Sequence, residues 1–144
     1  EAMNFYTSVF PGQGNVYMRY SKDQAPEKEG TIAYAGFTLF GQEFGIMDSA
    51  NKHEFNFTEA ISLLVKCDTQ EEIDEYWAKL SAVPESEQCG WLKDKYGVSW
   101  QISPSIMDTV MASGDQAKID RVTQAFLKMK KFNIAELEKA AEGK

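Results

Sequence analysis

The sequence predicts an α+β fold in which two βαβββ modules form a cupped mixed sheet with helices on the outside, followed by a C-terminal helical tail. Two observations predict the modules: the chain resembles itself at two places, and the two matches come in the same order. A third observation, a hydrophobic content of 43% with mixed charge over 144 residues, is typical of a globular domain with a real core.

The internal repeat is visible in two pairs of segments. Residues 1–10, "EAMNFYTSVF", align with 71–80, "EEIDEYWAKL", and both have apolar residues at helical spacing. Residues 40–49, "FGQEFGIMDS", align with 96–105, "YGVSWQISPS". In both of these a glycine follows an aromatic residue, as a hairpin turn with positive φ requires. Two matches in one order indicate a duplicated unit.

The first module is expected over 1–49 and lacks the strand that should open it. The repeat therefore predicts a strand just before Glu1. The remaining elements are a helix at 1–10 and strands at 14–21, 31–40 and 42–49. The charged segment 22–30, which contains Pro and Gly, is a solvated hairpin loop.

The second module is expected over 60–104, after a linker at 49–57. It contains a strand at 60–67, a helix at 69–81, a weak strand at 85–89, and strands at 90–93 and 98–103. We expect the paired modules, 1–104, and the tail to form one structural domain.

The tail, 105–144, is expected to be helical and to serve packing or dimer contacts. Ser105 with Asp108 predicts a short capped helix, and Asn133 with Glu136 caps a last helix that runs through Ala141. Between them, a helix over 115–131 is predicted by an apolar stripe of Ile119, Val122, Phe126 and Met129.

Charge and composition exclude several classes of partner. The net charge is −7, which disfavours binding to the phosphate backbone of nucleic acid. No apolar run approaches the roughly 20 residues that span a bilayer, so no membrane partner is expected. Two cysteines, Cys67 and Cys89, are too few for a disulfide scaffold and favour a reducing, cytoplasmic location.

Four segments carry a resemblance to a known family: "EAMNFYTSVFP" (1–11), 55–81, "CGWLKDKYGVSWQISP" (89–104) and "MKKFNIAELEKA" (129–140). With these and the two modules, the sequence resembles the glyoxalase, bleomycin-resistance and extradiol dioxygenase superfamily, known as the vicinal oxygen chelate fold. It is most similar to the PhnB-like branch, whose members often carry the label 3-demethylubiquinone-9 3-methyltransferase. We do not expect methyl transfer, because the only glycine pattern, Gly12-x-Gly14, is too weak to indicate a nucleotide-like cofactor.

The resemblance also implies where metal ligands would stand. Metal-using members carry one ligand on the first strand of each module and one on the last. Here those positions fall on Ser62, on Gln101, four residues past Gly97, and on Gly45, four residues past Gly41. A hydroxyl, a neutral amide and a glycine are poor donors for a transition metal. We therefore expect a metal-free site and no cofactor.

Strand alternation predicts which side chains line a cavity. Ser62, Leu64 and Lys66 should share the cavity face, and Trp100 should brace the strand from behind Gln101. Ser62 and Gln101 either hydrogen-bond a ligand or bond each other or water. The other ligand-pocket candidates are Trp91, Met47 and Phe44.

Other reactive side chains have simpler explanations. The only histidine, His53, lies in the linker and is expected on the surface. Cys67 and Cys89 have no second histidine to activate them, so we expect buried thiols. Glu71, Glu72, Asp74 and Glu75 open a helix, where carboxylates complement its dipole. Trp77 is expected to pack in the core.

The resemblance and the degenerate metal positions together favour a metal-free protein that binds an unknown small molecule. The alternative is a lyase, an isomerase or another enzyme of the same superfamily, with a metal completed by the missing strand or without one. Because superfamily members pair modules between chains, we also expect a homodimer.

Overall fold

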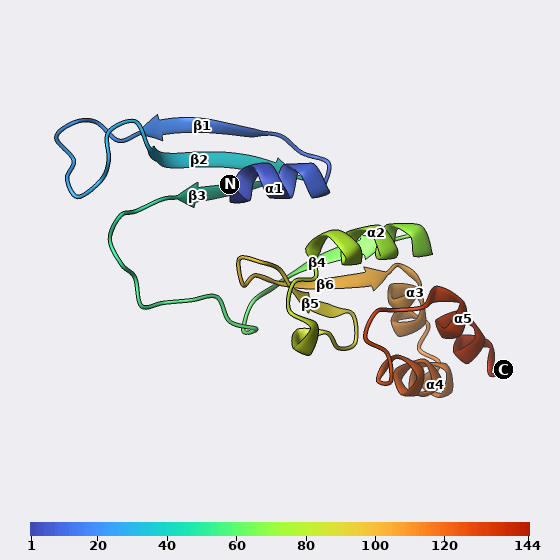
Figure 1. Ribbon diagram of the computed structural model, residues 1–144. Coiled ribbons are helices and arrows are strands. Elements are labelled where there is room, and N and C mark those ends of the chain that lie inside the picture. The colour runs from blue at the N-terminus through green and yellow to red at the C-terminus, as the bar shows by residue number, and fades with distance from the viewer. The chain divides into compact units, whose positions relative to one another are not determined.

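The computed structural model describes residues 1–144 and divides into two compact units, 1–55 and 56–144. Each unit contains one three-stranded sheet, and helices accompany both (Figure 1). The predicted α+β class is therefore confirmed. No helix combines the length and the apolar character that crossing a membrane would need.

The first unit is an antiparallel sheet with one helix packed against it. Its elements are α1 (Ala2–Val9), β1 (Gly14–Arg19), β2 (Ile32–Leu39) and β3 (Gln42–Met47), and the strand order is β1-β2-β3. Tyr6 of α1 stacks on Phe37 of β2, with ring centroids 5.9 Å apart. Phe37 stacks in turn on Phe44, its cross-strand partner, at 5.3 Å. These contacts bury one face of the sheet under α1.

The second unit contains a mixed sheet in the order β4-β6-β5. Its elements are β4 (Ser62–Cys67), α2 (Gln70–Leu80), β5 (Trp91–Lys93) and β6 (Ser99–Pro104). β4 pairs with β6 in parallel and β5 pairs with β6 antiparallel. A parallel pair requires a crossover connection, and α2 supplies it.

The predicted strand at 85–89 is wrong. Pro84–Ser86 forms a single 3-10 turn, and pairing is limited to one isolated bridge between Gln88 and Trp91. Pro84 has no backbone N–H to donate and its fixed φ suits the first turn of a helix, which favours the turn over a strand.

α2 begins with a complete capping box. The Thr69 side chain accepts from Glu72 N at 3.2 Å, and the Glu72 carboxylate accepts from Asp68 N at 2.7 Å and Thr69 N at 3.3 Å. On the face toward the sheet, Ile73 and Leu80 are buried. The helix therefore covers one face of the β4-β6-β5 sheet.

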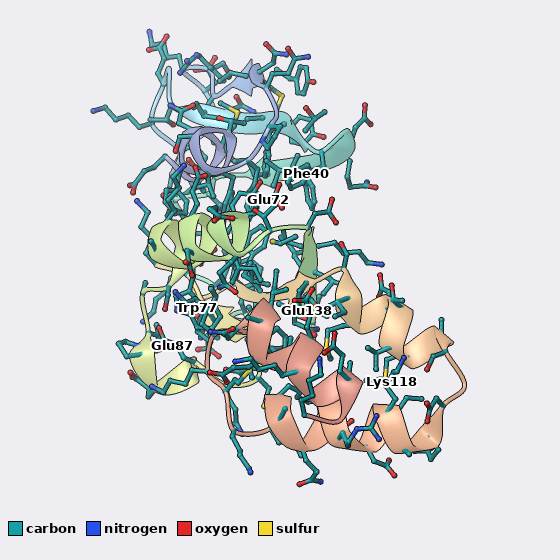
Figure 2. The ribbon with its side chains drawn as sticks, turned by 90° about the vertical axis from the view of Figure 1, so that its right-hand side faces the viewer. Phe40, Glu72, Trp77, Glu87, Lys118 and Glu138 are labelled. Carbon is teal, nitrogen blue, oxygen red and sulfur yellow. The ribbon has the colours of Figure 1, made fainter.

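The tail forms three short helices that pack on one another (Figure 2): α3 (Ile106–Ala112), α4 (Gln116–Phe126) and α5 (Ile134–Glu142). Asn133 caps α5 as predicted, since its side chain accepts from Glu136 N at 3.1 Å. The predicted cap at Ser105 is wrong, because Ser105 has helical φ and ψ and its hydroxyl donates to Asp68 and to Cys67 O instead.

α4 ends at Phe126, five residues before the predicted limit of 131. The carbonyls of Met129 and Lys130 accept from Cys89 N and Gly90 N, each at 2.8 Å. These bonds hold the segment after α4 beside the start of β5, so Met129, the last residue of the predicted apolar stripe, lies in a loop.

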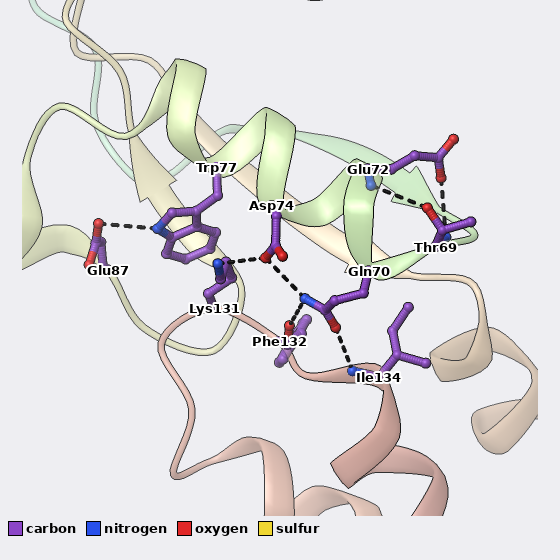
Figure 3. A network of polar contacts seen from close by, with 9 residues as sticks. All are labelled: Thr69, Gln70, Glu72, Asp74, Trp77, Glu87, Lys131, Phe132 and Ile134. Carbon is purple, nitrogen blue, oxygen red and sulfur yellow. Dashed lines mark hydrogen bonds and ion pairs between the residues drawn. The ribbon is translucent and has the colours of Figure 1, made fainter.

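A polar network ties this loop to α2 (Figure 3). The Gln70 side chain donates to Phe132 O and to Asp74, and accepts from Ile134 N at 2.9 Å. Lys131 pairs with Asp74 at 2.5 Å. The Lys131 and Gln70 hydrogen bonds hold the pKa of the Asp74 carboxyl below its usual value.

Candidate ligand-binding faces

The two faces of the second sheet differ sharply in polarity. One face carries buried side chains from all three strands, among them Val65, Leu92, Trp100 and Ile102, and it is the face that α2 covers. The opposite face, here called the second open face, carries Ser62, Leu64, Lys66, Trp91, Lys93, Ser99, Gln101 and Ser103. Alternation along each strand produces this division.

Gln101 lies in the middle of the second open face. It is the register partner of Leu64 on one side and of Trp91 on the other. Its Nε2 donates to Ser62 Oγ at 2.8 Å, so these two predicted pocket residues bond each other directly. Leu64 is 55% exposed and Trp91 is half-buried, which leaves apolar surface around this pair.

Two further polar groups of this face were not predicted. Ser99, the register partner of Ser62, is 2% exposed, and its Oγ has no hydrogen-bond partner. Lys93 forms an ion pair with Glu59, and the side-chain hydrogen bond from Lys93 lowers the pKa of the Glu59 carboxyl. Alternation from Gln101 could have predicted that Ser99 lies on this face, but the sequence could not have shown that its hydroxyl lacks a hydrogen-bond partner.

The first unit also has an open face, opposite α1. A hollow of about 320 Å³ lies on it, bordered by the polar side chains Gln13, Asn15, Thr38 and Glu43 and by Tyr17 and Tyr34. Its floor includes Gly36 and Gly45, which are cross-strand partners on β2 and β3. We refer to this feature as the tyrosine hollow.

The tyrosine rings of the hollow lie against the two glycines. A Cβ placed on Gly36 would be 2.6 Å from Tyr17 Cε2, and a Cβ placed on Gly45 would be 2.9 Å from the Tyr34 hydroxyl oxygen. The Tyr17 and Tyr34 ring centroids are 5.7 Å apart. Glycine at both positions is therefore what lets the rings approach the sheet so closely.

Sequence reasoning missed Tyr17 because of an irregularity in β1. The register between β1 and β2 shifts between Val16 and Met18, so simple alternation does not give the face of Tyr17. Tyr34 and Glu43 lie on regular strands, opposite Met47 and Thr38. Alternation from Gly45 could have placed both on the open face.

The predicted residues of the first unit fall on both faces of its sheet. Met47 lies on the open face beside Tyr34 and is 73% exposed. Phe44 is among the residues that line the tyrosine hollow, and its ring stacks on Phe37 on the face that α1 covers. Trp100, in the second unit, is 3% exposed behind Gln101 as predicted, and its Nε1 donates to Asp94 Oδ2 at 2.8 Å.

The histidine and the two cysteines lie outside the candidate faces. His53 is exposed and stacks on Phe55 at 4.8 Å. Cys67 and Cys89 are free thiols; Cys67 is 1% exposed, and burial, with smaller effects of Glu72 and Asp68, raises the pKa of the Cys67 thiol to about 12. Such a thiol stays protonated and unreactive at neutral pH.

The acidic start of α2 is a solvated helix face, as predicted. Glu72 caps the helix, Asp74 pairs with Lys131, and Glu75 pairs with Lys79. Trp77 is half-buried, and its Nε1 donates to Glu87 Oε1 at 3.3 Å (Figure 3). No group of three His, Cys, Asp or Glu side chains is arranged to hold a metal ion.

Comparisons with known proteins agree on one family. The family model described as 3-demethylubiquinone-9 3-methyltransferase matches residues 1–103. The PhnB protein from Bacillus cereus, whose structure bears the same description, is 47% identical, with a TM-score of 0.60 over 72% of this chain and 88% of that one. Protein PA1353 from Pseudomonas aeruginosa is 14% identical, with a TM-score of 0.53 over 72% and 86%, and shows similarity of fold. A comparison with curated proteins gives no match.

Proposed function

The chain belongs to the PhnB-like family described as 3-demethylubiquinone-9 3-methyltransferase, and from this premise we propose that it is a small-molecule-binding protein of the glyoxalase-like, vicinal oxygen chelate type. We propose two separate candidate binding positions, one on the open sheet face of each unit: the tyrosine hollow in the first and the Ser62–Gln101 pair in the second. The chemistry of these faces, hydrogen-bonding groups set among apolar surface, is what a ligand site requires.

One observation carries the proposal. In each unit a helix covers one face of the sheet, while the opposite face keeps polar side chains, and in the first unit a hollow of about 320 Å³ lies on that face. A sheet that served stability alone would not need the unpaired, buried hydroxyl of Ser99 in the second unit, because such a group costs free energy.

We propose that binding at these positions needs no transition metal. Gly45 has no side chain, and the Tyr34 ring occupies the space that a larger residue would need there. Ser62 and Gln101 offer a neutral hydroxyl and a neutral amide, already bonded to each other. Transition metals are held by imidazole, thiolate or carboxylate groups.

The residues present do not fit a nucleotide-like methyl donor, so methyl transfer is not part of the proposal. The strand-to-helix junction at Asp68 and Thr69 has no glycine, and the Glu72 carboxylate already accepts from both backbone amides. A Cβ on Gly12 would lie 1.8 Å from Thr38 O, so packing explains the glycine of the weak Gly12-x-Gly14 pattern.

A binding screen tests the proposal. The metal content of the purified protein is measured first, and small molecules are then screened for those that raise its melting temperature. Compounds that do so should shift backbone amide resonances on β2, β3, β4 or β6. For a ligand bound at the second open face, Gln101→Ala should weaken binding by about 1–3 kcal/mol, since it leaves a polar group unpaired. Gln124→Ala, on the exposed side of α4, is the matched control.

Two results would contradict the proposal. A broad screen in which no compound shifts those resonances would remove the binding function. Stoichiometric zinc, nickel or iron bound through Gln101 would overturn the metal-free assignment and favour the alternative, a lyase, isomerase or other enzyme of the superfamily.

We also propose a cytoplasmic location and a homodimer. The free thiols of Cys67 and Cys89 support a reducing compartment. The dimer is supported by exposed apolar side chains, which commonly mark contact surfaces. These are Met47, Phe55, Phe57 and Ile61, all at least 66% exposed.

A further inference from the structure

We infer that the tyrosine hollow takes an organic cation, with the charged ammonium or guanidinium group held against the faces of Tyr17 and Tyr34. This inference rests on the proposed function and specifies the ligand class at one of its two faces. It follows from the orientation of two rings, from one carboxylate and from the charges of the residues that border the hollow.

Each ring meets one glycine of the Gly36–Gly45 pair with its edge, because Cε2 and the hydroxyl oxygen are among the ring atoms nearest the place of a Cβ. A ring that stands on its edge above the sheet keeps its faces for the hollow, which both tyrosines border. The ring centroids are 5.7 Å apart and the ring planes are tilted by 31°, so one ligand can contact both rings. Tyr17 is 64% and Tyr34 is 39% exposed, so both retain surface for a ligand. An aromatic face attracts a cation through its quadrupole.

The charge at the hollow has one sign. Glu43 is the only bordering residue that is charged at neutral pH, and no Lys or Arg borders the hollow. Arg19, on the same strand as Tyr17, donates to Gly30 O at 2.8 Å. An anionic ligand would therefore meet Glu43 with nothing to balance its charge, whereas a cation gains from Glu43 and from both rings.

The remaining polar groups of the hollow suit the neutral part of such a ligand. Gln13 and Asn15 carry side-chain amides, and Thr38, the partner of Glu43, carries a hydroxyl. These groups both donate and accept hydrogen bonds, so they select for shape and polarity rather than for charge.

Three probes with one phenyl ring and different charge test the inference: benzyltrimethylammonium, benzyl alcohol and phenylacetate. Each is titrated into the whole chain while backbone amide resonances are followed. We expect benzyltrimethylammonium to bind at least fivefold more tightly than benzyl alcohol, with shifts at Gly36 and Gly45, and phenylacetate to bind least.

Variants separate the ring from the charge. Tyr17→Leu keeps apolar bulk but removes the ring, and should weaken benzyltrimethylammonium binding about two- to fivefold, whereas Tyr17→Phe should leave it within twofold. Glu43→Gln should weaken it by a similar factor. Glu29→Gln removes the same charge from an exposed loop of the same unit and should have no such effect, which controls for net charge.

The outcomes distinguish this inference from the proposed function. Equal or tighter binding of benzyl alcohol or phenylacetate at Gly36 and Gly45 overturns the cation class while leaving a small-molecule site. If Glu43→Gln and Glu29→Gln lose equal affinity for benzyltrimethylammonium, the effect comes from net charge alone, which also overturns the inference. A failure of every compound in the broader screen removes the proposed function itself.

Discussion

At the scale of single residues, two serines of the second unit lie in contrasting surroundings. Ser99 Oγ is buried without a partner, while Ser81 Oγ donates to Glu87 Oε1 at 2.6 Å. That bond is the largest of the interactions that lower the pKa of the Glu87 carboxyl. The two hydroxyls therefore should contribute to stability with opposite signs.

We predict that Ser99→Ala raises the free energy of unfolding by about 0.5–1 kcal/mol, because it removes an unpaired buried polar group. Ser81→Ala should lower the free energy by about 1 kcal/mol, because it leaves the Glu87 carboxylate short of a donor. Urea unfolding of both variants measures this. A loss of stability in Ser99→Ala comparable to that in Ser81→Ala would mean that the Ser99 hydroxyl has a partner.

A second prediction concerns Cys67. Its pKa in the fold, about 12, lies above the ordinary value of 9.0, so the protonated thiol is favoured in the folded state. Its contribution to stability is complete below pH 9 and is lost as the pH rises toward 12, by at most about 1.4 kcal/mol per pH unit. Between pH 9 and 11 the unfolding free energy should therefore fall more steeply in the natural chain than in Cys67→Ala. Parallel slopes would contradict the raised pKa.

Single residues also show how much of the site the alternation of side chains along a strand can predict. Counting four residues past Gly97 predicted that Gln101 lies on the cavity face of the last strand. Its neighbour Trp100 is buried on the opposite face of the sheet, as expected. The face on which Tyr17 lies could not be predicted, because the register between β1 and β2 shifts beside it. An irregular register depends on the fit between strands rather than on residue type.

At the scale of elements, the β5–β6 hairpin depends on one buried carboxylate. Asp94 is 1% exposed and accepts from Tyr96 N at 2.8 Å, Val98 N at 3.0 Å and Trp100 Nε1 at 2.8 Å. Gly97, with φ of +85°, completes the turn. Asp94 thereby fixes Trp100 on the covered face, and the alternation of β6 turns Gln101 to the open one.

We predict that Asp94→Ala destabilises the protein by about 3 kcal/mol, since three donors lose a buried acceptor at once. Asp108→Ala is the control: its pair with Lys66 is largely exposed, so it should cost less than 1 kcal/mol. Thermal unfolding compares the two. Equal small effects would show that the hairpin is held by its strands and not by Asp94.

Elements with strong local signals were predictable, and those decided by contacts between distant segments were not. The cap at Asn133 and the start of α2 at Thr69 follow from sequence alone. The end of α4 does not, because the bonds from Cys89 and Gly90 to the loop after it join segments some 40 residues apart.

At the scale of the whole molecule, the α+β class and the PhnB-like family could both be predicted from the repeat and the resemblance. The cupped pairing of the two modules and the ligand site remain predictions. Side-chain patterns identify the open faces, but the ligand depends on surface chemistry that no periodicity encodes.

The homodimer is the prediction that belongs to this scale. Sedimentation equilibrium at micromolar concentration should give twice the chain mass of 16.2 kDa. Phe57→Ser and Ile61→Ser, at exposed apolar positions, should lower that mass without unfolding the protein, because they remove apolar contact area. A mass of 16.2 kDa for the natural chain would contradict the dimer.

The placement of the tyrosine rings on glycines has an evolutionary consequence. A methyl group at position 36 or 45 would push aside the edge of the tyrosine ring beside it, so substitutions at Gly36 and Tyr17, and likewise at Gly45 and Tyr34, should be coupled. Among relatives, these positions should covary: where either glycine has become a larger residue, the facing tyrosine should have become smaller. A lineage that lost either glycine would thus change one wall of the hollow by a single substitution, without any change to the rest of the sheet.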